Sequence, residues 1–287
     1  MHDALGTLQR EERAVTTVAP VRSLRVPILM YHEIAPRSEA ASRLAVTPEA
    51  FAEQLAWLHQ EGCQTVTAAE LSAVLAGDAG ELPDRPVVLT FDDGYADFHT
   101  RAMPMMEQYG FRATVFVTTG WVDDAGPLPT GRRPGRMMSW SQVEEAAQAR
   151  FEVAAHSHLH PQLDRVSPKR LREELQVSKA QLEDKTGSPV TGLAYPFGYS
   201  NARVRHAARE LGHSYACAVS NVMMSDRSDL LALPRLTVRR STRIPTFQHL
   251  VRGSSLRRIF MKDRALTKGW AVARRSMAAL SSVSRDE

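Results

Sequence analysis

Residues 87–95 constrain this chain most, because an apolar run there ends in two adjacent carboxylates and a glycine. The aliphatic and β-branched run is short enough to be a buried strand, and Gly94 marks the turn that follows it. Asp92 and Asp93 should therefore lie at the carboxyl end of the strand, where α/β folds place their active sites. Neighbouring strand residues point to opposite faces, so the two acids can have different roles.

Strand-like and helix-like segments alternate along most of the 287-residue chain. The pattern predicts strands at residues 25–32, 87–91, 113–117, 151–155, 191–195 and 214–219. It predicts helices at 48–61, 68–76, 103–109, 139–150, 168–185 and 202–211, several of which begin after a Ser or Thr cap. Such alternation implies an α/β fold with parallel strands and right-handed crossovers.

Composition and charge divide the chain into three parts. Residues 1–24 form a polar extension, 25–250 a single large domain and 251–287 a basic tail. From Arg252 onward nine basic residues outweigh three acidic ones, a net charge of +6, so the total of +4 leaves −2 for the remainder. The high isoelectric point therefore belongs to the tail, and we expect no nucleic-acid partner. Because the N-terminus lacks an apolar signal-peptide core, we expect a cytoplasmic protein.

Three separate segments place metal-binding or catalytic side chains after predicted strands. They are His32, the pair Asp92 and Asp93, and the pair His156 and His160. In a barrel these strand ends meet at one rim. Two histidines four residues apart and one carboxylate make a three-ligand set that leaves positions open on a metal, as catalytic ions require. Taken alone, the two histidines could equally be solvated side chains of a polar loop or a helix start. His158 offers an alternative ligand, but its side chain should face away if the segment turns helical after His156.

Two of these motifs together resemble the polysaccharide deacetylases of carbohydrate esterase family 4. The first is Thr-Phe-Asp-Asp-Gly at residues 90–94, and the second is His-Ser-x-x-His at 156–160. The resemblance implies a distorted (β/α) barrel of about seven parallel strands. It also implies that Asp92 is the general base and that Asp93, His156 and His160 bind one divalent metal ion, most often Zn²⁺.

The third motif of the family, Arg-x-Pro-x-Gly, is altered in this chain. Residues 194–198 read Ala-Tyr-Pro-Phe-Gly, so alanine stands where the family has the arginine that supports the base. By resemblance, Tyr195, Pro196 and Phe197 shape the substrate pocket, and the Phe197 N–H would stabilise an oxyanion. Arg235 either replaces the lost arginine or is a surface arginine at a strand start.

The family's Leu-x-x-His motif lies near the N-terminus here, at residues 29–32, instead of near the C-terminus. This order is similar to the circularly permuted branch that contains poly-N-acetylglucosamine deacetylases. On that resemblance His32 is the catalytic acid and Leu29 lines the pocket for the acetyl methyl group. The alternative is that His32 has only a structural role, as a core histidine hydrogen-bonded to the backbone.

The function implied by the resemblance is removal of acetyl groups from an N-acetylated carbohydrate. Two other functions stay open: hydrolysis of a non-sugar C–N bond by a related amidohydrolase, and carbohydrate binding without catalysis. In the tail, apolar and basic residues alternate over 250–275, which suits a helix on an anionic membrane surface or one packed on the domain. A membrane partner through the tail is therefore a further expectation, alongside the carbohydrate.

Overall fold

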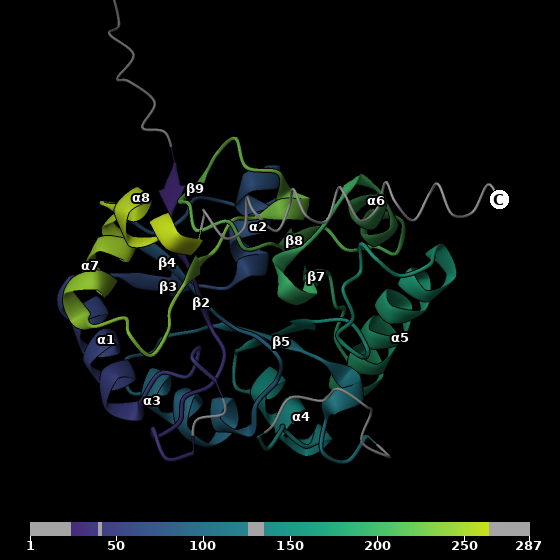
Figure 1. The fold of residues 1–287 in the computed structure, drawn as a ribbon, viewed down its shortest axis with the longest axis horizontal. Coiled ribbons are helices and arrows are strands. Elements are labelled where there is room, and N and C mark those ends of the chain that lie inside the picture. The colour runs from purple at the N-terminus through teal and green to yellow at the C-terminus, as the bar shows by residue number, and fades with distance from the viewer. Residues whose placement is uncertain (1–23, 40–41, 126–134, 264–287) are drawn as a thin grey trace, which may run out of the picture.

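The computed structural model describes residues 24–39, 42–125 and 135–263 (Figure 1). Its strands are β1 (Arg25–Val26), β2 (Ile28–Tyr31), β3 (Gln64–Val66), β4 (Pro86–Phe91), β5 (Thr114–Val117), β6 (Glu152–Ala155), β7 (Gly192–Ala194), β8 (Tyr215–Cys217), β9 (Met224–Ser225) and β10 (Leu236–Thr237). Its α-helices are α1 (Pro48–Gln60), α2 (Ala68–Ala76), α3 (Met103–Glu107), α4 (Trp140–Gln148), α5 (Pro168–Thr186), α6 (Ala202–Glu210), α7 (Ile244–Arg252) and α8 (Leu256–Ile259). Five of the six predicted strands and all six predicted helices are present, with ends shifted by a few residues. The predicted strand 25–32 is instead divided at Pro27 into β1 and β2, which belong to different sheets.

The main sheet runs in the order β10-β2-β4-β5-β6-β7-β8, and every neighbouring pair in it is parallel. These seven strands confirm the predicted class. The short strand β3, which the sequence did not predict, pairs with the start of β4 and widens the sheet there. β1 and β9 form a separate antiparallel pair.

The segment around Leu233 joins the two edges of the main sheet. Leu233 exchanges backbone hydrogen bonds with the end of β8, donating to Ala216 O at 2.8 Å and accepting from Ala218 N at 2.9 Å. Three residues later the same segment becomes β10, whose Leu236 is in register with Leu29 of β2. The sheet therefore curls into a barrel, with this irregular segment as the seam.

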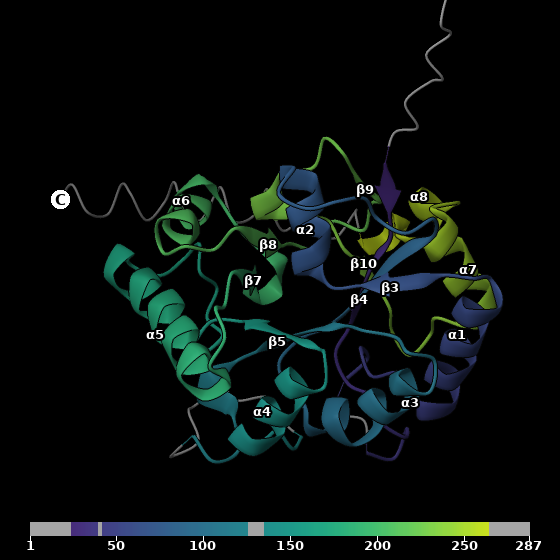
Figure 2. The same ribbon diagram turned by 180° about the vertical axis from the view of Figure 1, so that it is seen from behind.

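Helices surround the barrel, and the strands lie in the middle of the molecule (Figures 1 and 2). The helix starts follow the predicted cap chemistry: the Ser139 hydroxyl accepts from Gln142 N while the Gln142 side chain accepts from Ser139 N. α5 begins after Ser167 and ends at Gly187, whose φ of 65° is the left-handed conformation that closes helices. Beneath β2 and β4, the rings of Tyr31, Phe51 and Phe91 pack at centroid distances of 5.2–5.9 Å.

Part of the predicted tail contacts the domain. Phe260, just after α8, is 2% exposed, and Asp263 forms an ion pair with Arg239 at 2.9 Å. The predicted N-terminal extension up to residue 23 and residues 264–287 of the basic tail lie outside the described residues. Within the described ranges, no helix combines the length and the apolar character that crossing a membrane requires.

Candidate metal and catalytic site

The carboxyl ends of the parallel strands bring the predicted side chains to one rim of the barrel. His32 follows β2, Asp92 and Asp93 follow β4, and His156 follows β6. Phe197 lies in the turn after β7. The structure thus brings together residues that lie up to 165 positions apart in the sequence, as the barrel argument requires.

Asp93, His156 and His160 form a compact buried cluster. One ligand atom from each lies within 4.8 Å of the other two, and all three side chains are buried. The Nε2 atoms of His156 and His160 lie 3.5 Å and 3.3 Å from Asp93 Oδ1. His156 is held in one tautomer because its Nδ1 donates to the Ala194 carbonyl at 2.8 Å. Its Nε2 lone pair therefore faces the carboxylate, an arrangement that suits a divalent cation.

The backbone around this cluster adopts unusual conformations that aim the ligands. Asp93, Ser157, His160 and Phe197 all have φ between 58° and 75°, a region that residues other than glycine seldom occupy. They are four of the seven such residues in the described ranges. Strain of this kind concentrates at functional sites, where the surroundings hold it in place.

His158 is not part of the ligand cluster. Its ring Nδ1 lies 2.9 Å from the Thr119 hydroxyl, so the side chain faces away, as the sequence argument required. The left-handed turn at Ser157, not a helix, produces this orientation. Burial lowers the pKa of His158.

Glu174 of α5 supports the histidine loop from behind, and the sequence analysis missed it. This carboxylate is fully buried and accepts from the backbone N–H groups of His158 and Leu159 at 2.9 and 2.7 Å. Arg170, one turn earlier, pairs with its other oxygen at 2.6 Å. In the sequence Glu174 looks like any acid on a charged helix face, so nothing there distinguishes it.

Asp92 forms a buried, bidentate ion pair with Arg235. Nη1 of Arg235 lies 2.6 Å from Oδ1 and Nη2 lies 2.8 Å from Oδ2, and the arginine has no exposed surface. Of the two options for Arg235, the structure therefore shows the contact with Asp92 and not a surface arginine. Burial acts to raise the pKa of Asp92. The electrostatic effect of its neighbours Arg235, His156 and His32 is larger and opposite, so the pKa lies below its ordinary value. Asp92 is accordingly ionised at neutral pH.

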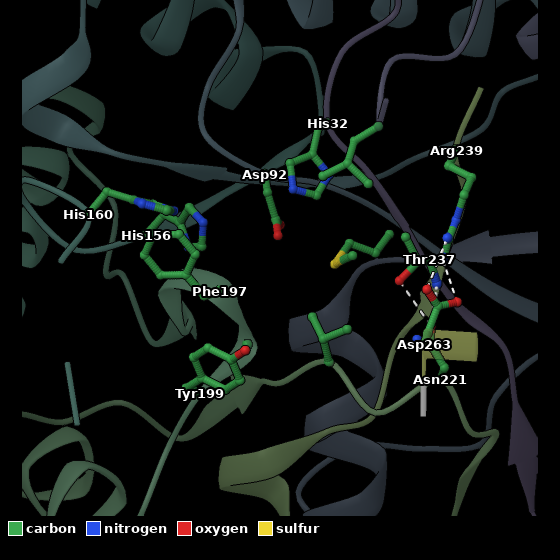
Figure 3. Close-up of a pocket in the computed structure, with 14 residues that line it drawn as sticks. His32, Asp92, His156, His160, Phe197, Tyr199, Asn221, Thr237, Arg239 and Asp263 are labelled. Carbon is green, nitrogen blue, oxygen red and sulfur yellow. Dashed lines mark hydrogen bonds and ion pairs between the residues drawn. The ribbon is translucent and has the colours of Figure 1, made fainter. Parts of the chain in front are cut away.

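A cavity of about 360 Å³ opens beside these groups. His32, Asp92, His156, His160 and Phe197 all line it, and Figure 3 shows Asp92 and His32 between the histidine pair and a second polar group. Phe197 is 47% exposed, unusual for a large apolar side chain in this protein. The cavity gives a substrate simultaneous access to the ligand cluster and to Asp92.

Three of the four predicted pocket residues do not line the cavity. Leu29 is buried in the core, and Met30 lines the cavity in its place, because alternate residues of β2 point to the same face as His32. Tyr195 is buried too, and its hydroxyl donates to the Leu231 carbonyl at 2.9 Å. Pro196 is buried without reaching the cavity. Of the four, Phe197 alone lines the cavity.

The chain folds as a (β/α) barrel, and at one rim it carries a buried Asp93, His156 and His160 cluster that could hold a divalent ion. The polysaccharide deacetylase family profile matches residues 79–216. Bacillus subtilis YxkH, named as a polysaccharide deacetylase, is 27% identical over 237 residues, which cover 82% of this chain and 79% of YxkH. In sequence, the chain is therefore similar to polysaccharide deacetylases over residues 79–216 and, at lower identity, over most of its length.

Other relatives carry more specific names. The poly-beta-1,6-N-acetyl-D-glucosamine N-deacetylase of Escherichia coli K12 is 31% identical over 137 residues, but these cover only 45% of this chain and 20% of that protein. The Staphylococcus aureus protein of the same name is 22% identical over 75% of this chain and 73% of its own. Among solved structures, the Streptococcus pyogenes deacetylase PplD in complex with acetate has a TM-score of 0.70 and 27% identity, covering 80% of this chain and 99% of PplD.

A substitution at Gly120 should disturb the histidine loop. A Cβ there would lie 2.7 Å from the His158 carbonyl oxygen and 2.4 Å from Leu159 Cδ2, and the backbone contact cannot give way cheaply. We expect Gly120→Ala to cost about 1–3 kcal/mol of stability and to weaken binding of a divalent ion, measured by zinc titration. Gly80→Ala is the matched control, because nothing lies within 4 Å of its Cβ. Equal zinc affinity in the two variants would contradict this role for Gly120.

Proposed function

We propose that this protein is a metal-dependent hydrolase that removes the acetyl group from an N-acetylated sugar of a glycan. One observation carries the proposal: His156 and His160 of the buried cluster with Asp93 line the same cavity as His32 and the ionised Asp92. Similarity to polysaccharide deacetylases and the names of these relatives support the substrate class.

Asp93, His156 and His160 would hold one divalent ion, and we propose Zn²⁺ because two imidazoles and one carboxylate suit it. Such an ion supplies a Lewis acid for the acetyl carbonyl and lowers the pKa of water bound to it. The Ala194 carbonyl and Glu174 would maintain the ligand geometry, since supporting contacts of this kind set the orientation of ligands.

Asp92 is proposed as the general base. It must be ionised to take a proton from the attacking water, and the Arg235 ion pair keeps it so. The same ion pair locks the carboxylate against rotation, which fixes the direction of the proton transfer. Arg235 would act through Asp92 and not on the substrate.

His32 is proposed as the acid that protonates the departing nitrogen. An amine anion leaves poorly, so a proton must reach the nitrogen as the C–N bond breaks. His32 lines the cavity close to Asp92, and its presence there lowers the pKa of that carboxyl. The Phe197 N–H is proposed as a donor to the developing oxyanion, held in place by the left-handed turn at that residue.

The test is acetate release from N-acetylglucosamine oligomers, compared with release of the corresponding product from non-sugar cyclic and linear amides. We expect acetate from the oligomers, loss of activity with a chelator and recovery with Zn²⁺. Turnover of the amides alone would favour the amidohydrolase alternative. Oligomer binding without any turnover would favour the non-catalytic one.

A further inference from the structure

Four residues form a second polar group in the cavity, apart from the metal and catalytic residues. We call this group the polar wall; it consists of Asn221, Thr237, Arg239 and Asp263. Figure 3 shows the polar wall across the cavity from His156, His160 and Phe197. None of its members belongs to the motifs that identify the family. Its side chains come from β10, the segments beside it, and the end of the described chain.

The side chains of the polar wall are fixed by contacts with one another. Arg239 donates to both Asp263 oxygens, at 3.1 and 2.9 Å, and its guanidinium lies over the Phe260 ring at 5.8 Å. Asn221 Oδ1 accepts from both the backbone N–H and the hydroxyl of Thr237, at 3.0 and 2.9 Å. This pairing fixes the Asn221 amide so that its nitrogen is the group it can offer to the cavity. The wall is therefore a preformed set of donors and acceptors.

The charge balance of the wall decides which ligands suit it. Arg239 is the one cationic side chain at this end among the described residues that line the cavity, and Asp263 already neutralises it. A phosphate group would need an uncompensated cation to replace its hydration. Sugar hydroxyls, in contrast, both donate and accept, so they match a wall that offers a carboxylate, an amide and the remaining N–H groups of a guanidinium.

The same cavity also has apolar lining. Met30, Leu44 and Val219 contribute to it, and Met30 is in register with Thr237 of the wall on the neighbouring strand. Pyranose rings have apolar C–H faces and polar edges, so a ring could lie on this surface with its hydroxyls at the wall. The acetamido group would then reach the metal cluster.

We propose that the polar wall binds the hydroxyls of a neutral sugar unit, so that the substrate is an uncharged glycan and not a phosphate-linked sugar such as a nucleotide sugar or a lipid-diphosphate intermediate. The proposal rests on the proposed deacetylase function for the identity of the reacting group. It predicts that Asp263 sets both the affinity for neutral sugar and the discrimination against phosphate.

The experiment compares two disaccharides of β-linked N-acetylglucosamine, one as its methyl glycoside and one as its 1-phosphate. Their dissociation constants are measured by calorimetry on zinc-loaded Asp92→Asn protein, with and without Asp263→Asn. We expect Asp263→Asn to raise the dissociation constant of the methyl glycoside by about 10-fold or more, the usual loss for a hydrogen bond to a charged group. The 1-phosphate should bind as tightly as before or more tightly, because Arg239 loses its counterion. Asp263→Glu should restore most of the affinity for the neutral sugar.

Two controls separate the wall from general damage and from failure of the proposed function. Glu61→Gln removes an ion pair between Glu61 at the end of α1 and Arg252 of α7, which are 3.3 Å apart and do not line the cavity, so neither constant should change. Unchanged constants in Asp263→Asn, or equal weakening of both ligands, would overturn the role of the wall. Acetate release by the wild-type protein is measured in parallel. If acetate is released but Asp263→Asn leaves both dissociation constants unchanged, only the proposed role of the polar wall is wrong. If the dissociation constants change as expected but no acetate is released, only the proposed deacetylase function is wrong.

Discussion

Replacing Asp92 with asparagine is expected to lower kcat by about 10²–10⁴-fold, the usual contribution of a general base. Asparagine has nearly the same shape and can still accept a hydrogen bond from Arg235, so the fold and the cavity should persist. Because Asp92 is not among the clustered ligand atoms, one divalent ion per chain should remain bound. Elemental analysis and acetate release, measured on the same preparation, check both parts.

Asp93→Asn is the matched comparison, because it makes the same chemical change one residue later. The Asp93 carboxylate lies within 3.5 Å of the Nε2 atoms of both histidines. Its loss should therefore lower the metal affinity by more than the 10- to 100-fold that is typical when a supporting residue is lost. Added zinc should restore part of the activity of Asp93→Asn and none of that of Asp92→Asn. The same response in both variants would show that the two acids do not have separate roles.

Arg235→Met is expected to have the second large effect, through both stability and pH dependence. Removing one partner of a buried ion pair leaves an uncompensated charge, at a cost of about 3–5 kcal/mol. With Arg235 present, the pKa of Asp92 lies below its ordinary value, so activity should fall only when the pH drops through that low value. Without Arg235, burial dominates and the pKa rises, so the acid limb of kcat/KM should move to higher pH by about 1–3 units.

Arg235→Lys controls for the loss of the side chain itself. It keeps the positive charge but cannot bond both carboxylate oxygens, so the acid limb should stay closer to that of wild type than in Arg235→Met. Thermal melts at several pH values check folding independently. An acid limb at the same pH in all three proteins would mean that Arg235 does not control the ionisation of Asp92.

The regular part of the fold was predictable because its signals are local. Strands such as β4 and β5 are short runs of mainly apolar and β-branched residues, and helices such as α4 and α5 begin at cap residues that the sequence displays. The barrel seam was not predictable for the opposite reason. β10 has only two residues, and the segment that closes the sheet around Leu233 depends on partners from β8 and β2 that lie far away in the chain.

Some residues of the site were likewise predictable from the sequence, and others were not. Asp92, Asp93, His156 and His160 follow strands and match motifs, and the structure places the three expected ligands together. The pocket residues depend on which face of a strand or turn they occupy, and the motif comparison assigned Leu29 to the cavity although Met30 shares the face of His32. Glu174 and the polar wall have no signal in the sequence, because their roles arise from contacts between distant segments.

The metal content of the wild-type protein and of His156→Ala, with acetate release measured on each, tests whether Asp93, His156 and His160 hold a catalytic ion. His156 contributes a buried ligand atom whose orientation the Ala194 carbonyl fixes, so its removal should empty the site. The account predicts about one divalent ion per wild-type chain with acetate release from N-acetylglucosamine oligomers, and the loss of both in His156→Ala. Acetate release by a wild-type protein that binds no metal, or full activity in His156→Ala, would contradict it.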